Sequence, residues 1–432
     1  MGVCLYLAIA AATVLAAMAV NRTEGLPAGT RGAMLRRSCL LLILVILAVP
    51  AILRQETGND YLRYVEFFHL ASIDAYVPTE KGFNLLVKAI YALCGYENYL
   101  LVFAVYATLT IGLMLLAIRQ QAEDFAFSFF LFMMFGYYFQ SFNTMRYYFA
   151  LSIALVAMTC LLRRRYIGFL LLVILAALFH KSALVVLVLY PLALHRWKTW
   201  QRIAVCGLGA AAMVFHDKVL QLLVALYPSW EGTGDLAAGT SVSWVNIAKC
   251  AAVLILALLV LRRAGNEPAK ACRIPASRAI RLYVNGSFLA LLLYVFGWFV
   301  PEMSRICYYL TFTQIFLIPM LLHRIPENES LRILRGRRNQ KSAGDTDDSM
   351  GAASLMDIAS SRGTTSSTER EASRESGKTC TMRRLLTGIV ILAAVLYFAL
   401  FLKTAYRDTI KILPYKSFLF HELNQTPSGS IE

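Results

Sequence analysis

Polar side chains that could do chemistry are few in this sequence, and they fall at separate points of an apolar chain. They include a histidine, which titrates nearest neutral pH, carboxylates, which can take up a proton, and arginines and lysines, which bind anions. Tyrosines and an asparagine accompany them. The residues are Asp60, Tyr61, Tyr64, Glu80, Asn143, Arg146, His180, Lys181, Arg305, Tyr415 and Lys416. They can act together only if the surrounding elements bring them to one place.

Composition indicates the solvent in which these elements fold. The chain has 432 residues, of which 58% are hydrophobic and only 16% are charged, whereas about 25% of an ordinary soluble domain is charged. Apolar segments of about 20 residues recur along its length. We therefore exclude a soluble enzyme, a disordered chain and a disulfide-stapled secreted domain. The net charge of +16 resides in short clusters that orient membrane helices, so nucleic-acid binding is not expected.

The lysine and arginine clusters predict the direction of each crossing, because basic loops stay in the cytoplasm. The first apolar segment, 3–20, has no basic residue before it, so we interpret it as a span with an outside N-terminus and not as a signal peptide. Alternation then predicts an all-α membrane protein with about twelve spans. They are 3–20, 38–53, 98–118, 125–139, 145–163, two hairpin arms on either side of 180–182, 203–215, 243–261, 282–300, 306–322 and 385–402.

The parity of this topology depends on the 29 mostly apolar residues between Arg165 and His195. A single helix would place the basic residues at its ends on opposite sides, whereas a hairpin that turns at 180–182 keeps both ends inside. Each arm then has about 14 residues and a length of about 21 Å, which is less than the hydrocarbon core of about 30 Å. We therefore expect His180 to lie below the outer surface, in a cavity lined by protein.

Three parts of the chain are predicted. Residues 1–325 form the polytopic membrane core, and 381–432 form the last transmembrane helix and an outer tail. Residues 326–380 are rich in serine, threonine, glycine and mixed charge and contain no aromatic residue. Because such a composition cannot build a core, we predict a disordered cytoplasmic insert.

This topology places all of the polar residues named above on the outer side. Basic residues are disfavoured there by the orientation rule and need another reason to be present. Each has a plainer explanation: Arg146 could reach the outer headgroups, His180 could cap a helix, and Arg305 could anchor at the interface. A catalytic or binding site in an outer-face cavity would account for all of them together.

Several short motifs resemble those of a known family. They are Asn59-Asp60-Tyr61-x-x-Tyr64, Glu80-x-Gly82-Phe83, Phe142-Asn143-x-Met145-Arg146, Phe179-His180-Lys181-Ser182-Ala183, Arg305-x-x-x-Tyr309 and Pro414-Tyr415-Lys416. In this order and spacing the chain resembles the EpsG family of bacterial exopolysaccharide polymerases, which are Wzy-like membrane proteins. The resemblance covers nearly the whole chain apart from 326–380. The family usually has glutamine after the arginine, where this chain has Tyr147.

The resemblance implies a glycosyltransferase of the bacterial inner membrane that works on its outer face. It would polymerise oligosaccharide repeat units linked to undecaprenyl pyrophosphate into an O-antigen, a capsule or an exopolysaccharide. Arginine and lysine would bind the pyrophosphate that leaves, and a base would take the proton of the acceptor hydroxyl. The predicted catalytic residues are His180, Arg146, Arg305, Asp60 and Glu80. The predicted substrate-binding residues are Tyr61, Tyr64, Asn143, Tyr147, Lys181, Ser182, Tyr309, Tyr415 and Lys416.

No metal or other cofactor is predicted, because the outer loops contain no DxD element and the nine cysteines form no CxxC pair. The expected partners are the lipid bilayer, the lipid-linked oligosaccharide, and a chain-length regulator and a flippase of the same pathway. Two other functions stay open. A lipid-linked oligosaccharide flippase predicts polar residues through the whole membrane depth. An outer-face glycan ligase or acyltransferase would share the basic site and use a different donor or acceptor.

Overall fold

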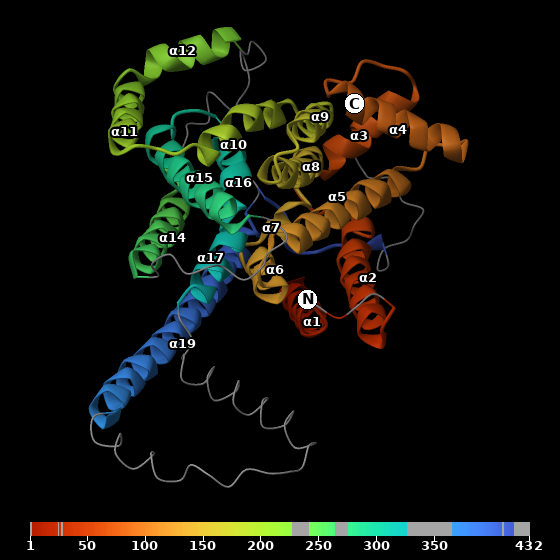
Figure 1. Cartoon of the computed structure of the whole chain (residues 1–432). Coiled ribbons are helices and arrows are strands. Elements are labelled where there is room, and N and C mark those ends of the chain that lie inside the picture. The colour runs from red at the N-terminus through yellow and green to blue at the C-terminus, as the bar shows by residue number, and fades with distance from the viewer. Residues whose placement is uncertain are drawn as a thin grey trace. The chain divides into compact units, whose positions relative to one another are not determined.

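The computed structural model consists of helices joined by turns (Figure 1). It describes residues 2–24, 26, 29–226, 242–263, 275–301, 303–325, 365–407 and 410–418. Within these residues no strand occurs, and the single extended pairing is the bridge between Arg54 and Ser417. The predicted all-α polytopic membrane fold is therefore confirmed.

Eight helical segments in the described ranges are long and apolar enough to cross a membrane. They are α1 (Gly2–Arg22), α2 (Arg31–Ile52), α5 (Tyr99–Gln121), α8 (Met145–Leu162), α14 (Trp244–Arg263), α15 (Ala276–Phe296), the consecutive pair α16 (Met303–Thr311) and α17 (Gln314–His323), and the apolar part of α19 (Thr365–Thr404). A ninth candidate is the pair α11 (Thr199–Val214) and α12 (His216–Leu226), which is bent by 88°.

The predicted count of about twelve spans is not confirmed. The remaining predicted spans correspond to short apolar helices, namely α6 (Phe125–Met134), α9 (Tyr166–Ala177) and the 3₁₀ turn η1 (Lys181–Val185) that continues into α10 (Val186–Leu194). A helix of 12 residues such as α9 is about 18 Å long and cannot cross a hydrocarbon core of about 30 Å alone. A break in the helix at His180 separates α9 from η1 and α10, at the position where the sequence predicts a turn.

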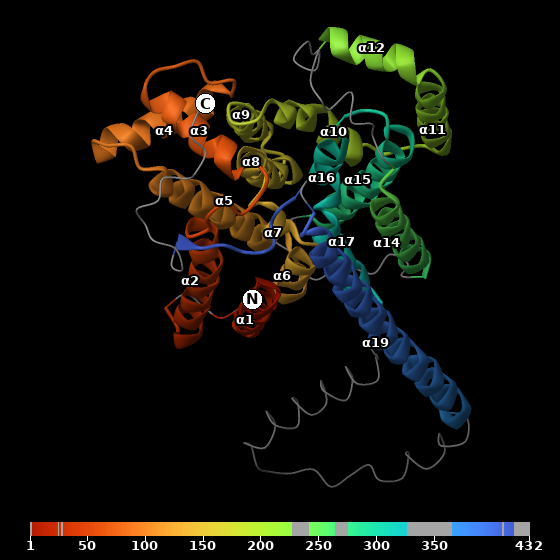
Figure 2. The same ribbon diagram turned by 180° about the vertical axis from the view of Figure 1, so that it is seen from behind.

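By contacts the chain divides into two compact units. The first comprises Met1–Ala257, Ala269–Met320 and Ala394–Glu432 and contains all of the predicted site residues. In its interior α8 packs against α5 and α9, while α2 packs against α5 and α1 against α6, as the two opposite views show (Figures 1 and 2). Of the apolar window of α8, 83% is buried. This central helix carries Arg146 in its first turn.

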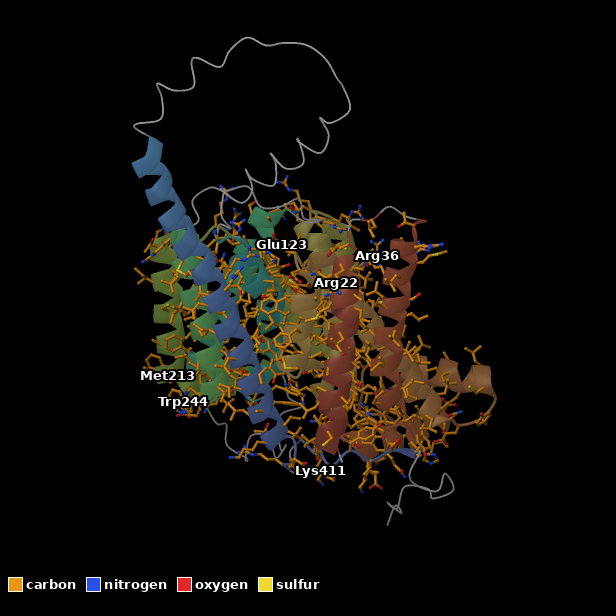
Figure 3. The ribbon with its side chains drawn as sticks, turned by 90° about the horizontal axis from the view of Figure 1, so that it is seen from below. Arg22, Arg36, Glu123, Met213, Trp244 and Lys411 are labelled. Carbon is orange, nitrogen blue, oxygen red and sulfur yellow. The ribbon has the colours of Figure 1, made fainter. Side chains whose placement is uncertain are left out.

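The two ends of the first unit are marked by different residues. Arg22, Arg36 and Glu123 lie at one end, and Met213, Trp244 and Lys411 lie at the other, which we call the Lys411 end (Figure 3). The basic residues that delimit α1 and α2 are thus on one side, in agreement with the alternation predicted from the charge clusters. The backbone N–H of Gly58 donates to the carbonyl of Lys411 over 2.8 Å, so the segment after α2 belongs to the Lys411 end.

The second unit comprises Leu258–Pro268 and Leu321–Ala393. In it the Arg383 guanidinium lies 3.0 Å from Nδ1 of His323. The helix α19 begins at Thr365, so residues 365–380 are helical where the sequence predicts disorder. Glutamate, arginine, alanine and lysine in this stretch are good helix formers, and they extend the helix that the apolar span begins. The rest of the predicted insert, 326–364, lies outside the described residues.

Candidate functional site

An ion pair between Arg146 and Glu80 is the centre of the site. Arg146 Nη1 and Glu80 Oε2 are 2.6 Å apart, and their side chains are 19% and 13% exposed. Glu80 is the N-cap residue of α4 (Lys81–Cys94) but makes no capping hydrogen bond, so its carboxylate is directed to Arg146. A pair that is this well shielded from solvent has a fixed geometry, unlike an exposed ion pair.

Aromatic rings surround the arginine of this pair. The guanidinium carbon lies 5.4 Å from the ring centre of Phe83 and 5.9 Å from those of Tyr64 and Phe67. These contacts are favourable cation–π interactions. Nε of Arg146 is buried and has no hydrogen-bond partner within the described ranges. The arginine is therefore held firmly but retains a donor that is not satisfied by the protein.

Glu80 also binds the turn of the short hairpin. Its Oε1 accepts a hydrogen bond from the backbone N–H of Lys181 over 3.1 Å, and the N–H of Gly82 donates to the carbonyl of Leu178 over 2.9 Å. A Cβ at Gly82 would come within 2.7 Å of that carbonyl oxygen, so only glycine allows the approach. Both carboxylate oxygens of Glu80, which the sequence predicts as a candidate base, are therefore engaged in contacts with the protein.

His180 begins the 3₁₀ turn and forms a short polar chain. Its Nδ1 accepts from the backbone N–H of Ser182 as the N-cap and lies 2.8 Å from Ser182 Oγ. The same Oγ lies 3.2 Å from the hydroxyl of Tyr309. Because Nδ1 accepts, the neutral ring carries its proton on Nε2.

The environment of His180 disfavours its protonation. Burial lowers the pKa of His180 to about 3, and the positive charges of Arg305 and Arg146 add to this effect. A histidine with such a pKa stays neutral near pH 7 and is a weak base. The geometry thus supports the capping role that the sequence left open.

Asp60 combines a partly buried carboxylate with nearby cations. Its backbone N–H donates to Asn143 Oδ1 over 3.2 Å, and although Asp60 is the N-cap residue of α3 (Tyr61–Ser72), its side chain makes no capping hydrogen bond. Burial raises the pKa of Asp60, while the charges of Arg305, Arg63 and Arg146 lower it. A raised pKa makes this carboxylate a better proton acceptor than an exposed one.

A glycine allows Asp60 to reach Asn143. Gly58 has a positive φ of 96°, and a Cβ there would lie 2.6 Å from the carbonyl oxygen of Phe142. Only glycine adopts this conformation without strain and leaves room for the second backbone. The segment after α2 and the loop before α8 are therefore in direct contact at the Lys411 end.

Arg305 lies in the first turn of α16 and is tied to α8 through its backbone. The hydroxyl of Tyr147 donates to the Arg305 carbonyl over 2.6 Å. The Tyr147 ring also lies 5.5 Å from the rings of His180 and Tyr309. Tyr147 thus joins α8, the hairpin turn and α16.

The predicted sugar-binding tyrosines are inside the protein. The exposed fractions of Tyr61, Tyr64, Tyr147 and Tyr309 are 1%, 4%, 1% and 0%. Tyr61 stacks on Phe103 with ring centres 4.9 Å apart, and the Tyr64 hydroxyl accepts from the backbone N–H of Arg146 over 3.4 Å. Rings packed in this way hold the site together and present no free face to a sugar in this conformation.

Tyr415 and Lys416 lie beside a different segment. The Tyr415 hydroxyl donates to the carbonyl of Pro50 over 2.9 Å, and Lys416 Nζ lies 2.8 Å from Glu56 Oε2. The extended segment that contains Tyr415 and Lys416 pairs with the residues that follow α2, because the N–H of Gln55 donates to the Lys416 carbonyl over 3.0 Å. The structure therefore groups these two residues with the end of α2, while Asp60, Glu80, Asn143, Arg146, His180, Lys181, Ser182, Arg305 and Tyr309 form the other group.

Arg54 is a functional candidate that the sequence reading missed. It follows α2 directly and is only 3% exposed, with its guanidinium carbon 5.1 Å from the ring centre of Phe103 and 5.3 Å from that of Phe142. The available signal was an arginine after an apolar run on the side where basic residues are disfavoured.

Over the ranges that the structure describes, no group of three or more His, Cys, Asp or Glu side chains is placed to hold a metal ion.

Comparison with known proteins identifies one matching family. The sequence model described as the EpsG family matches residues 37–334. No curated protein and no solved structure matches the chain. The matched range includes Arg54 and the whole group formed by Asp60, Glu80, Arg146, His180 and Arg305, whereas Tyr415 and Lys416 lie beyond it.

Proposed function

Because the chain belongs to the EpsG family, whose members are polysaccharide polymerases, we propose that it polymerises lipid-linked oligosaccharide repeat units. It is a multi-pass membrane protein, and the proposal assigns it to the bacterial inner membrane with the Lys411 end outside. The observation that supports this activity best is the convergence of five segments that lie apart in the sequence, which carry Asp60, Glu80, Arg146, His180 and Arg305.

The arginines of this group suit the leaving group of the reaction. In the proposed donor the growing glycan is joined to undecaprenyl pyrophosphate, which leaves with negative charge. A partly buried guanidinium interacts with such a charge more strongly than an exposed one, because the effective dielectric is lower. Nε of Arg146 has no hydrogen-bond partner in the part of the chain that the structure describes, and the positive charges of Arg305 and Arg146 both act on the Asp60 carboxylate. Both arginines are therefore assigned to stabilising the departing pyrophosphate.

Asp60 is the base that the geometry favours. The acceptor hydroxyl oxygen forms a bond to the anomeric carbon of the donor glycan, its proton passes to the Asp60 carboxylate, and the bond between that carbon and the pyrophosphate oxygen breaks. The electron pair leaves with the pyrophosphate, so atoms and charge balance. His180 is neutral and accepts hydrogen bonds through Nδ1, and it is assigned to orienting the hairpin turn.

Deletion of the gene and sizing of the surface glycan test the proposed function. We expect the deletion strain to carry single repeat units on its surface and the plasmid-borne chain to restore long polymer. Absence of any repeat unit outside the cell would instead indicate a flippase. Long polymer that remains on its lipid carrier would indicate a ligase. Either of these two results would overturn the proposal.

A further inference from the structure

Arg54 is a buried cation without a negative partner. Among the described residues its guanidinium makes no ion pair and no side-chain hydrogen bond, and its Nε is buried and unsatisfied. The nearest acidic side chain along the chain, that of Glu56, is paired with Lys416 instead. Removing a charge from water without a partner is costly, so a buried arginine of this kind indicates a functional role.

The surroundings of Arg54 compensate for only part of this cost. The rings of Phe103 and Phe142 lie on the guanidinium and provide cation–π attraction. Burial nevertheless lowers the pKa of Arg54, in spite of the opposing influence of Tyr61, Tyr64, Tyr138 and Tyr6. The aromatic side chains contribute no full negative charge at neutral pH, so the site as it stands lacks an anion.

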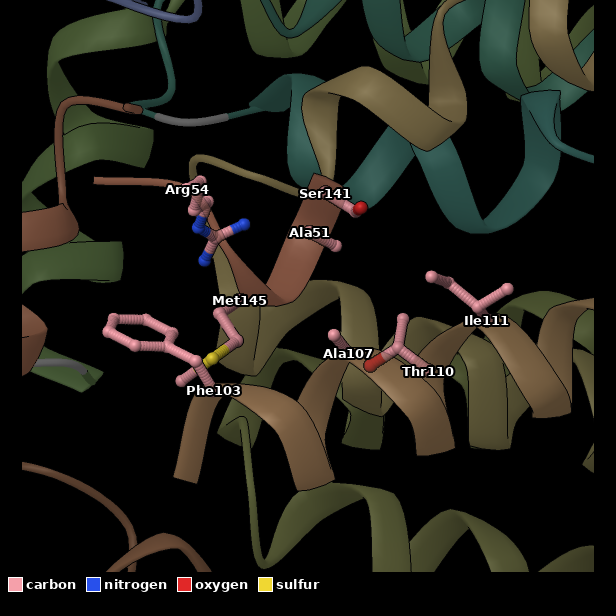
Figure 4. Close-up of a pocket in the computed structure, with 8 residues that line it drawn as sticks. All are labelled: Ala51, Arg54, Phe103, Ala107, Thr110, Ile111, Ser141 and Met145. Carbon is pink, nitrogen blue, oxygen red and sulfur yellow. The ribbon is translucent and has the colours of Figure 1, made fainter. Parts of the chain in front are cut away.

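The guanidinium lies at one end of a narrow slot between α2 and α5. The slot is lined by Ala51, Arg54, Phe103, Ala107, Thr110, Ile111, Ser141 and Met145 (Figure 4). Arg54, Phe103 and Met145 gather at one end of it, and Ile111 lies at the other (Figure 4).

The lining residues of α5 run along one helical face. Phe103, Ala107, Thr110 and Ile111 are spaced by four, three and one residues, and the eight steps from the first to the last cover about 12 Å of helix. The slot therefore begins at a cation and continues along apolar and small side chains into the depth of two spans. This combination suits an amphiphile with an anionic head and a hydrocarbon chain.

We propose that the Arg54 slot is a second phosphate site, which binds the phosphate head of a lipid-linked substrate separately from the Arg146 site. The inference rests on the proposed function, since polymerisation requires a donor and an acceptor that are both linked to lipid phosphates. The first turn of α8 separates the two sites. Met145 lines the slot, and Arg146, the next residue, reaches Glu80 on the other side.

The slot must widen to admit its ligand. In this conformation its cavity volume is about 10 Å³, which is near the lower limit for one water molecule. Met145 is an unbranched side chain with several rotatable bonds and can move aside readily. Only the end of the slot at Arg54 needs to open, so that a phosphate oxygen can replace the aromatic contacts of the guanidinium.

Equilibrium binding to the full chain in nanodiscs tests this site without any need for polymerisation. The probe is radiolabelled undecaprenyl pyrophosphate, and the number of sites per chain is measured. We expect two sites for the wild-type chain and one for Arg54→Gln, with binding at the lost site weakened roughly tenfold or more. The matched control is Lys88→Gln, which removes one charge from an exposed ion pair with Asp74 and should keep both sites.

A second variant protects the test against misfolding of Arg54→Gln. Ala107→Leu keeps every charge and fills the slot with a larger side chain, so it should also leave a single site. Two sites in both variants would overturn the proposal even if the wild-type chain polymerises. Equal competition by inorganic pyrophosphate and by undecaprenyl monophosphate would show a site for free anions and would overturn the lipid assignment. Failure of the wild-type chain to polymerise lipid-linked repeat units would contradict the proposed function and leave the site count unchanged.

Discussion

Two arginines near the first turn of α8 are treated in opposite ways by the fold. Arg146 is paired with Glu80 over 2.6 Å and is 19% exposed, whereas Arg54 is 3% exposed and has no carboxylate partner. Both lie against aromatic rings. The comparison shows two ways of preparing an arginine to bind an anion. Arg146 is oriented by the Glu80 carboxylate, whereas Arg54 is buried away from solvent without a carboxylate partner among the described residues.

The two arginines also differ in the carboxylates that lie near them. Near Arg146 the protein supplies both Glu80, which is engaged in hydrogen bonds, and Asp60, whose pKa is raised by burial. Near Arg54 in the sequence, the carboxylate of Glu56 forms an ion pair with Lys416 instead. Acid–base chemistry is therefore expected only at the Arg146 site, and the Arg54 slot is expected to bind without reacting.

The largest effect should follow from Asp60→Asn. Asparagine keeps the size and the backbone contact with Asn143 but cannot take up a proton, so we expect the rate of polymerisation to fall about a hundredfold or more. The measurement is the rate of glycan growth in membranes that contain equal amounts of each variant. Glu66→Asn, at an exposed position of α3, is the control. A rate within a few fold of the wild type would remove Asp60 from the role of base.

The next largest effect is expected for Arg146→Lys. Lysine keeps the charge but loses the planar fork that binds Glu80 and pyrophosphate together. The loss of a charge-assisted hydrogen bond of about 2 kcal/mol corresponds to a rate about thirtyfold lower. Polymer length in membranes is the measurement, and Arg63→Lys, at an exposed arginine of α3, is the matched control. Long polymer from Arg146→Lys at normal protein levels would contradict its assignment to the leaving group.

Substitution by methionine should change the thermal stability of the protein in different directions at Arg146 and at Arg54. Arg146→Met leaves Glu80 half-buried and without its partner, which we expect to cost on the order of 1–3 kcal/mol and to lower the melting temperature by a few °C. Arg54→Met removes a buried, unpaired charge, so the melting temperature should stay equal or rise. Thermal unfolding of the two purified variants provides the measurement. Equal destabilisation by both substitutions would mean that Arg54 has a partner that contributes as much as Glu80.

The all-α membrane fold could be predicted from the sequence for a physical reason. Hydropathy and the lysine and arginine clusters act over whole segments, so they place Asp60, Arg146, His180 and Arg305 on the same side of the membrane. They do not report pairing. The approach of the Glu80 segment to the hairpin turn depends on Gly82, which allows a close backbone contact, and the burial of Tyr147 and Tyr309 depends on neighbours far apart in sequence.

Hydropathy and charge patterns report depth in the membrane and not lateral position in the bundle. The sequence predicts sugar binding by Tyr61, Tyr64, Tyr147 and Tyr309, whereas the structure packs these side chains inside the protein. The segments of short helices such as α6 and α9 were counted as full spans, because a run of apolar residues shows the preference for lipid and not the point at which a helix ends.

The charge of Arg305 should be visible in the pH dependence of activity. Its positive charge opposes the effect of burial and lowers the pKa of Asp60. Activity requires the deprotonated carboxylate, so it is lost as the pH falls through that pKa. Arg305→Gln should therefore move the acidic limb of the rate profile to higher pH, while Arg305→Lys should leave it near its original position. An acidic limb at the same pH in both variants would show that Asp60 is not the group that titrates.

The smallest effect is expected for His180→Gln. His180 accepts the N–H of Ser182 as the cap of the 3₁₀ turn, and its lowered pKa keeps it neutral near pH 7. Glutamine can accept the same hydrogen bond and cannot act as a base, so activity should stay within about threefold of the wild type if the cap is the main role. His180→Leu, which removes the acceptor, should be clearly less active. The pair of variants is compared by glycan growth at equal protein levels. Complete inactivation by glutamine would return His180 to the role of base and would leave Asp60 as an electrostatic neighbour of Arg146.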